Sequence, residues 1–505
     1  MYSAVAISVT QRLKNISQIA VHAVAVLAVF SALLLLAASP VLAQTEEVLY
    51  NFGGTTSDGN NPYSGLIFHN GSLYGTTTLG GLFGQGTVFQ LAPNGKGAWT
   101  ETVLYNFCPV APSCTDGQNP AYGKLVFDSK GNLYGTAYNG GSLGNGVVFE
   151  LSPAGSTWNY DVIYNFAGQP DAANPVSGLV MDTKGNLYGT AYSGGGADSG
   201  AVFQVYSNGN GTWSEQVIAS VPEIFGGLAI DSQNYLYGTT SNSVIKIIPN
   251  GTNNWYLANI MTFTTQAQGN TPNGTPMLDP VGNVYGTTTY GGKNNLGVIY
   301  KLTKGGTLKY TEKVLYSFGA NGTLPYGGLV MDSTGNLYGA TTAGGKNDAG
   351  VVYKLIYNNG TYVGEISLQP FIGENGAVAY DSLILDSQNY LYGTTYYGGA
   401  NGDGTVFIAN PHANITTATV TSSLNPSKVG QAVTFTATIS SPAGPPPDGE
   451  IVVFQPVGQS AMKNGVATYT TSALQAGTTV VHALYNGDLN FTVIKSAPLD
   501  QVVQP

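Results

Sequence analysis

Acidic and amide side chains recur in the loops of this chain, where their oxygens could hold a cation or a polyol. Three loops begin with Asp-Gly-Asn-Asn-Pro, Asp-Gly-Gln-Asn-Pro and Asp-Ala-Ala-Asn-Pro, and three glycine-rich loops each add a carboxylate. Carboxylate and amide oxygens are the ligands that Ca²⁺ prefers in proteins, and they also hydrogen-bond hydroxyl groups. The candidate ligand-binding residues are Asp58, Asn61, Asp116, Asn119, Asp171, Asn174, Asp198, Asp348 and Asp403.

An alternative explanation needs no ligand, because Asp-Gly and Asn-Pro are common turn formers. No EF-hand loop or tandem calcium nonapeptide is present, so we expect no cofactor and keep Ca²⁺ as an open alternative. Two of these carboxyl groups could instead serve as the acid and base of a glycosidase, which must lie roughly 5–9.5 Å apart. Other charged residues expected on the same face are Glu223, Glu374, Asp381, Lys124, Lys293 and Lys346.

Other catalytic constellations are not expected. Beyond the N-terminal segment the chain has three histidines, His69, His412 and His482, which fall in a hairpin, a linker and a second domain. This spacing does not favour a catalytic triad or a histidine-rich metal site. The formal net charge of −10 and the absence of a basic patch argue against a nucleic-acid partner.

Cys108 and Cys114 are the only cysteines, and both lie in the loop Cys-Pro-Val-Ala-Pro-Ser-Cys. An even pair in an exported chain predicts a local disulfide. A metal or redox pair is the alternative, but no histidine lies near and the spacing is not Cys-x-x-Cys.

The N-terminus has the pattern of an export signal. Arg12 and Lys14 precede an apolar run, and Val41-Leu42-Ala43 places small residues before a cut at Gln44. We expect residues 1–43 to be removed, leaving no membrane span and a monomeric protein that is secreted or displayed at the cell surface. An uncleaved anchor over residues 19–38 is the alternative, because this run is nearly long enough to span a bilayer.

A repeated phrase determines the predicted architecture. Asp-Ser-Lys-Gly-Asn-Leu-Tyr-Gly-Thr at 128–136 has near-copies at 182–190, 231–239, 279–287, 332–340 and 386–394, and a short form at 69–76. A period near 50 residues, with four short alternating runs in each unit, predicts an all-β propeller with one unit per blade.

The chain should close this ring with its own first strand. The outermost-strand pattern Val-Leu-Tyr-Asn-Phe already occurs at 48–52, whereas the last unit stops at 404–410 without one. Seven copies serve seven blades only if residues 48–52 complete the last sheet, which removes open sheet edges. The predicted domains are a seven-bladed propeller over 44–411, a linker at 412–416 and an Ig-like β-sandwich over 417–505.

Several repeated residues have structural explanations. The aspartate of the phrase is expected to cap a turn, in which Gly131, or Asn in other copies, takes the left-handed conformation. The four tryptophans share one position beside a hairpin, which favours packing over a role as a sugar platform. Acidic residues recur near the start of the outer strand, where an exposed edge favours charge: Glu101, Asp161, Glu215, Glu312 and Glu365.

Two resemblances follow from these patterns. Residues 47–411 resemble the tandem GloVer repeat of the choice-of-anchor proteins, with units of the form Gly-Asn-Leu-Tyr-Gly-Thr-Thr, Gly-Gly, Gly-Thr-Val-Phe and Val-Leu-Tyr-Asn-Phe. Residues 417–503 resemble bacterial Ig-like repeat domains. The resemblance implies a secreted or surface-attached bacterial protein, and it supplies no established reaction and no catalytic motif to map.

We therefore expect a non-catalytic binding or scaffold protein whose interblade-loop face recognises an extracellular glycan or a cell-envelope protein. One alternative is a polysaccharide-degrading hydrolase or lyase that uses the acidic residues of this face. The other is a structural envelope component without a ligand. Convergence of two of these carboxylates at the channel mouth would favour the enzyme.

Overall fold

The computed structural model describes residues 46–95, 98–120, 124–196, 198–251, 254–345, 347–414, 416–485, 487, 489–491 and 494–505. The described residues up to His412 form one compact unit, and those from Ala413 onward form a second. The predicted export signal lies outside the described residues. Within these ranges, no helix has the length and apolar character needed to cross a bilayer.

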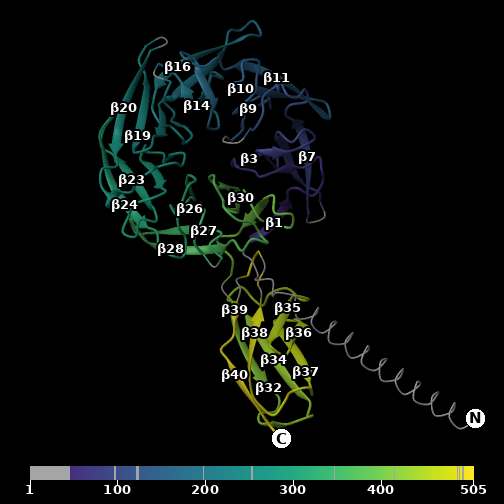
Figure 1. Ribbon diagram of the computed structural model, residues 1–505. Coiled ribbons are helices and arrows are strands. Elements are labelled where there is room, and N and C mark those ends of the chain that lie inside the picture. The colour runs from purple at the N-terminus through teal and green to yellow at the C-terminus, as the bar shows by residue number, and fades with distance from the viewer. Residues whose placement is uncertain are drawn as a thin grey trace, which may run out of the picture. The chain divides into compact units, whose positions relative to one another are not determined.

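The first unit is a ring of seven antiparallel sheets, which we call blades 1 to 7; six have four strands, and the sheet of blade 3 has a fifth (Figure 1). The first strands of the blades are β3 (Ile67–His69), β8 (Val126–Phe127), β13 (Val180–Met181), β17 (Ala229–Ile230), β21 (Met277–Leu278), β25 (Val330–Met331) and β29 (Ile384–Leu385). The second strands are β4 (Ser72–Thr77), β9 (Leu133–Ala137), β14 (Leu187–Gly194), β18 (Leu236–Thr239), β22 (Val284–Thr288), β26 (Leu337–Ala340) and β30 (Leu391–Thr395).

The outer half of each blade holds two longer strands. The third strands are β6 (Thr87–Pro93), β10 (Val147–Ala154), β15 (Ala201–Ser207), β19 (Ser243–Pro249), β23 (Val298–Lys304), β27 (Val351–Asn358) and β31 (Thr405–Ala409). The fourth strands are β7 (Trp99–Asn106), β11 (Thr157–Asn165), β16 (Trp213–Ser220), β20 (Trp255–Thr262), β24 (Tyr310–Ser317), β28 (Thr361–Pro370) and, in blade 7, β1 (Glu46–Asn51). Short strands β2 (Gly59–Asn60) and β5 (Leu79–Gly80) pair with each other, and β12 (Ala172–Pro175) pairs with β14 as the fifth strand of the blade 3 sheet.

The ring closes as predicted, because β1 is the outer strand of the last blade. It pairs antiparallel with β31, with Val48 opposite Phe407 and Tyr50 opposite Val406. A register shift interrupts this pairing, and a shift at the equivalent place interrupts the third and fourth strands of the other six blades. The N-terminal strand is therefore a full equivalent of the six other outer strands.

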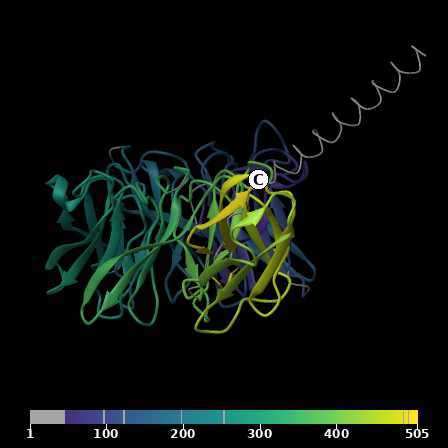
Figure 2. The ribbon, with the colours of Figure 1, turned by 90° about the horizontal axis from the view of Figure 1, so that it is seen from below.

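The core lies between blades. Phe166, Leu179, Leu187 and Phe203 form one such cluster between blades 2 and 3, and each side chain is almost fully buried. Burying a Leu or Phe side chain contributes roughly 1.5–3 kcal/mol, so these repeated interfaces stabilise the ring. Figure 2 shows the ring from the side, with the strands running between two sets of loops.

The repeated phrase builds one turn in each of blades 2 to 7. Asp182 Oδ1 accepts hydrogen bonds from the Lys184 and Asn186 N–H groups, both at 2.9 Å, which confirms the predicted cap. Its Oδ2 accepts a hydrogen bond from the Tyr188 hydroxyl at 3.0 Å, a contact that was not predicted from the sequence. The matching tyrosine–aspartate pairs are Tyr134–Asp128, Tyr237–Asp231, Tyr285–Asp279, Tyr338–Asp332 and Tyr392–Asp386.

The same tyrosines connect neighbouring blades. Trp255 of blade 4 packs edge-on against Tyr188 of blade 3, with ring centroids 5.7 Å apart. The equivalent pairs are Trp158–Tyr74, Trp213–Tyr134 and, across the closure of the ring, Trp99–Tyr392. The tryptophans thus pack between blades, as predicted from their repeated position.

The threonine that ends the phrase also links blades. Thr190 Oγ1 donates to the Gly226 carbonyl at 3.2 Å, and Thr394 Oγ1 donates to the Ser64 carbonyl at 3.0 Å across the closure. Thr136, Thr239 and Thr287 make the matching bond, and Thr76 donates to the Pro120 carbonyl of blade 2. Blade 6 carries Ala340 at this position and has no hydroxyl there.

The second unit is a sandwich of two sheets. One holds β32 (Thr417–Ser422), β34 (Val433–Ser440) and β37 (Val466–Thr471). The other holds β33 (Ser427–Lys428), β35 (Ile451–Gln455), β36 (Gly458–Ala461), β38 (Gly477–Tyr485), β39 (Ile494–Lys495) and β40 (Leu499–Gln504). Alternate side chains of the two sheets, among them Phe435 and Phe454, form a buried core, as predicted for an Ig-like sandwich.

Candidate functional site

The interblade loops and the glycine-rich loops share one face of the ring. In several blades a β-bridge joins the interblade loop to the glycine-rich loop of the same blade. Gln118 pairs in this way with Asn139, and Asn270 pairs with Tyr290. The hairpin turns of the repeated phrase, between the first and second strands of each blade, lie at the opposite ends of the strands. This division agrees with the predicted arrangement and directs attention to the interblade-loop face.

The three interblade aspartates among the candidate residues close their own loops. Asp58 Oδ2 accepts the Tyr50 hydroxyl at 3.0 Å and the Gly54 N–H at 3.1 Å. The equivalent donors are Tyr105 and Cys108 for Asp116, and Tyr164 and Ala167 for Asp171. The carboxylates are thus placed by the outer strand of the preceding blade.

The three candidate asparagines have positive φ angles of 57° (Asn61), 54° (Asn119) and 55° (Asn174), a conformation that Asn enters more readily than most residues. Each side-chain amide donates to a carbonyl of the preceding blade: Tyr396, Thr78 and Tyr138, respectively. They tie adjacent loops into a continuous rim.

The aspartates of the glycine-rich loops are also engaged locally. Asp198 and Asp348 accept the N–H groups of Gly194 and Gly344 at 2.8 and 2.7 Å. The Asp403 side chain lies against Gly53, where a Cβ would collide with it. None of the nine candidate residues is among the described residues that line the central cavity, so ligand binding by them stays a prediction.

The predicted disulfide joins Cys108 and Cys114 on this rim. The Cys114 carbonyl accepts the N–H groups of Gly117 and Gly141, both at 2.9 Å. The disulfide loop is thereby attached to the glycine-rich loop of blade 2.

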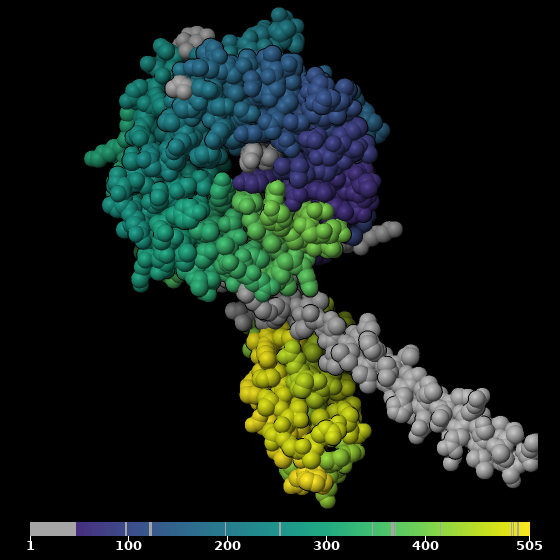
Figure 3. Space-filling view, viewed as in Figure 1, coloured from purple at the N-terminus to yellow at the C-terminus, as the bar shows by residue number. Residues whose placement is uncertain are grey.

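A central cavity of about 360 Å³ opens within the ring of inner strands, and Figure 3 shows the molecule hollowed there. Aromatic residues supply much of its lining: Tyr63, Tyr138, Tyr192, Phe225, Tyr326 and Tyr380. The polar side chains that line it are Lys124, Asn273, Thr275 and Asp381. The volume falls within the range of small-molecule sites.

The aromatic residues come from equivalent places in different blades. Tyr63, Phe225, Tyr326 and Tyr380 stand three residues before the buried leucine that leads into a first strand. Tyr63 stacks on Tyr380 with centroids 4.4 Å apart, and Tyr326 meets Tyr380 edge-on at 5.5 Å. The repeats contain this signal at a fixed distance from the leucine, but a role in the cavity was not predicted for these aromatic residues.

The cavity also brings an acid and a base close together. Asp381 of blade 7 and Lys124 of blade 2 both lie against Gly65 of blade 1, which lacks a side chain to separate them. Asp381 Oδ2 accepts the Gly65 N–H at 2.6 Å. Blades 3 and 4 carry Gly178 and Gly227 at the position of Lys124, so the charged pair breaks the repeat.

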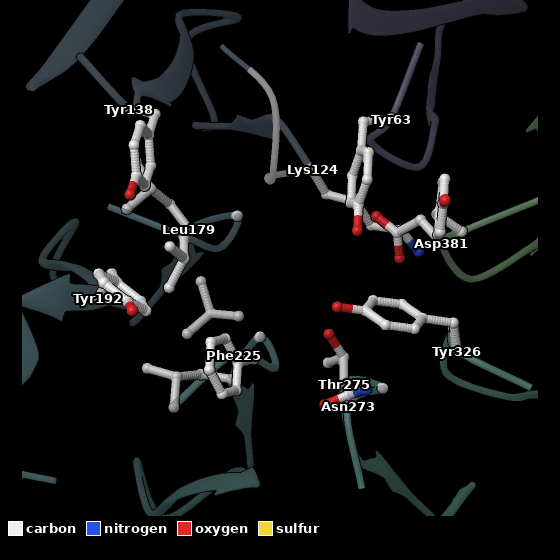
Figure 4. Close-up of a pocket in the computed structure, with 18 residues that line it drawn as sticks. Tyr63, Lys124, Tyr138, Leu179, Tyr192, Phe225, Asn273, Thr275, Tyr326 and Asp381 are labelled. Atoms are coloured by element: carbon white, nitrogen blue, oxygen red, sulfur yellow. The ribbon is translucent and has the colours of Figure 1, made fainter. Parts of the chain in front are cut away.

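Figure 4 shows that the two sides of the cavity differ. Tyr138, Leu179, Tyr192 and Phe225 lie along one side, and the other carries Tyr63, Lys124, Asp381 and Tyr326. A ligand with an apolar face and a hydroxylated or charged face would match this arrangement.

Only one of the acidic residues expected on this face, Asp381, is among the described residues that line the cavity. The described ranges also contain no group of three His, Cys, Asp or Glu side chains able to hold a metal ion. The two converging carboxylates that would favour a hydrolase are therefore not seen in the described cavity wall.

The expectation of an exposed edge is wrong for Glu101, Glu215 and Glu312, whereas Asp161 is exposed as expected. Each of the three glutamates has one carboxylate oxygen buried without a hydrogen-bond partner among the described residues. Glu101 and Glu312 alternate with exposed positions of their strands. The three glutamates interact with residues of the preceding interblade loops, namely Asp58, Gln268 and, for Glu215, Asp171. Burial, together with a hydrogen bond and charge repulsion from Asp171, raises the pKa of Glu215 to about 9. Burial, aided by Asp58, raises the pKa of Glu101 to about 7.

Solved structures with a similar fold differ widely in sequence. The extracellular domain of a protein described as a hybrid two component system, from B. thetaiotaomicron, matches with 13% identity and a TM-score of 0.45, over 92% of this chain and 58% of that one. A streptogramin B lyase matches with 14% identity and a TM-score of 0.47, over 72% and 97%. These likenesses concern the fold alone. No curated protein matches this chain.

Family models cover nearly the whole of the described chain. The Gloeobacter/Verrucomicrobia repeat matches residues 38–203, 100–252 and 243–439. The bacterial Ig-like domain of group 3 matches residues 419–504. Both resemblances inferred from the repeated motifs are thereby confirmed. With its seven repeated blades and its terminal sandwich, the chain belongs to the Gloeobacter/Verrucomicrobia repeat family and carries a C-terminal bacterial Ig-like domain.

Proposed function

We propose that this is an exported binding protein whose propeller takes a segment of a glycan into its central cavity. The observation that carries the proposal is the aromatic lining of the cavity, interrupted by one acid and one base. Aromatic rings offer flat apolar faces with polar edges, which suit the C–H faces of a sugar ring. Asp381, Lys124, Asn273 and Thr275 supply hydrogen-bonding groups for its hydroxyls.

Export is part of the proposal. The Cys108–Cys114 disulfide is typical of oxidising compartments outside the cytoplasm. The sequence pattern of residues 1–43 supports the same location. In this proposal the Ig-like domain serves as a spacer or attachment module.

Binding is favoured over cleavage by the composition of the cavity. A glycosidase of the usual kind needs two carboxyl groups on either side of the scissile bond. Asp381 is the only carboxylate among the described lining residues, and two of its oxygen contacts are to backbone N–H groups of Gly65 and Ser382.

The test is retention of the purified protein on a panel of immobilised neutral and acidic polysaccharides, with release of reducing ends measured in parallel. Phe225→Ala should lower retention at least tenfold, because this side chain lines the cavity. Tyr256→Ala is the matched control, since Tyr256 is about half exposed on β20 and is not a cavity residue. An empty panel would contradict the proposal, and reducing ends without retention would support an enzyme.

A further inference from the structure

The loops around the cavity form a rim that is low at one blade. Between the second and third strands, blades 1, 5 and 7 have residues 78–86, 289–297 and 396–404. Blade 4 has only residues 240–242 at this place. Because each residue extends a chain by at most about 3.6 Å, this turn cannot rise as far as its counterparts.

A second, independent shortening occurs in the same sector. The connection into blade 4 consists of residues 221–228, whereas the connections into blades 2 and 5 span residues 107–125 and 263–276. Ile224 in this short connection bridges to Thr240 in the short turn. Both the interblade loop and the loop between the second and third strands are therefore shorter at blade 4.

Aromatic side chains lie at this low point. Phe225 follows Ile224 directly, lines the cavity and is still 39% exposed. Tyr192 of blade 3 also lines the cavity and is 49% exposed, with its ring centroid 5.9 Å from that of Phe225. Figure 4 shows the two rings beside each other on the apolar side of the cavity. They continue the lining outward where the rim is lowest.

We propose that the ligand is an extended oligosaccharide that leaves the cavity over blade 4, so that the sugar unit at the mouth of the cavity stacks on Tyr192 and Phe225. This inference rests on the proposed function and specifies it: the site recognises a chain of several units rather than a monosaccharide or a chain end enclosed on all sides. Stacking of a further ring adds affinity because the exposed aromatic faces lose contact with water.

The experiment measures affinity against chain length by calorimetry. The probes are gluco-oligosaccharides with β-1,4 links and galacturonate oligosaccharides, each from one to six units. We expect affinity to rise with length up to the unit that passes blade 4. In the test variant, residues 289–297 replace residues 240–242, which raises the rim at blade 4. Its affinity for the longest probe should fall at least tenfold, to the level of the shortest probe that binds.

The matched control carries the same graft in place of residues 78–86 of blade 1, where the loop already has this length. Tyr192→Ala provides a second test that leaves the loop lengths unchanged. It should lower the affinity for the longest probe more than the affinity for the shortest. If polysaccharides are retained but affinity depends neither on length nor on the graft, the exit over blade 4 is wrong and the proposed function stands. If no probe or polysaccharide binds, both fail.

Discussion

The Tyr338 hydroxyl donates a 2.8 Å hydrogen bond to Asp332 Oδ2, from the strand that follows the turn to the residue that begins it. Burial alone raises the pKa of Asp332, but hydrogen bonds from Thr334, Asn336 and Tyr338 outweigh it and lower the pKa to about 2. The turn of blade 6 thus depends on an ionised carboxylate.

Asp332→Asn should therefore destabilise the propeller at pH 7 by about 1–3 kcal/mol, because one acceptor oxygen becomes an amide donor facing other donors. A carboxylate with a lowered pKa contributes stability above its unfolded pKa near 4 and loses it as the pH falls toward 2. The deficit of the variant should shrink over that window in urea denaturation. The control is Asp161→Asn, which changes an exposed carboxylate of β11.

Glu215→Gln should have the opposite pH dependence. A carboxyl group with a raised pKa binds its proton more tightly in the folded state, so its contribution is complete below about pH 4.5. The contribution is lost as the pH rises toward 9. The variant should match the parent near pH 5 and be more stable near pH 9, by thermal melting. If the variant and the parent show the same dependence of melting temperature on pH, Glu215 is not held beside Asp171. The control for the change in net charge is Glu47→Gln on β1.

Thr190→Val should cost about 1–2 kcal/mol, since it leaves the Gly226 carbonyl without its donor in a fully buried position. Blade 6 offers the converse experiment. Ala340→Thr restores the hydroxyl found in the other blades and should stabilise by up to about 1 kcal/mol. The free energy of unfolding of both variants is measured by chemical denaturation. If Thr190→Val leaves it unchanged, the threonine hydrogen bonds do not contribute to the association of the blades.

Removal of residues 44–52 should destabilise the whole ring. Phe52 is fully buried, and loss of a buried Phe side chain alone costs about 3–5 kcal/mol. The deletion also exposes the edge of β31. The measurement compares melting of chains that begin at Gln44 and at Gly53, and unchanged melting of the shorter chain would contradict the closure.

The fold was predictable because its requirements repeat. Each residue of the phrase has one packing or hydrogen-bonding role, as in the run Leu187, Tyr188, Gly189 and Thr190. The same residue types therefore recur in every blade where that role is needed. The closing strand was predictable for the same reason, since Val48 and Phe52 match the other outer strands. The inward direction of Glu215 was missed because charge on an outer strand usually marks a solvent-exposed edge.

The cavity was not predictable from residue type alone. Asp58 and Asp116 drew attention because their side chains suit ligand binding, yet both accept hydrogen bonds from tyrosines on the outer strand of the preceding blade. Asp381 and Lys124 were expected on the same face as many other charged residues, but their proximity was not predicted, because it depends on the space that Gly65 of the intervening blade leaves. This proximity depends on the distances between neighbouring blades, and these cannot be inferred from residue spacing within one repeat.

The pairing of β1 with β31 also sets the order in which the molecule can be completed. Val48 is synthesised early, but its partner Phe407 follows only after six blades of chain. Contacts so distant in sequence form slowly, because closure of the long intervening chain is entropically costly. The first strand must therefore wait, and a chain interrupted before blade 7 leaves a sheet edge open at the end of an unfinished ring.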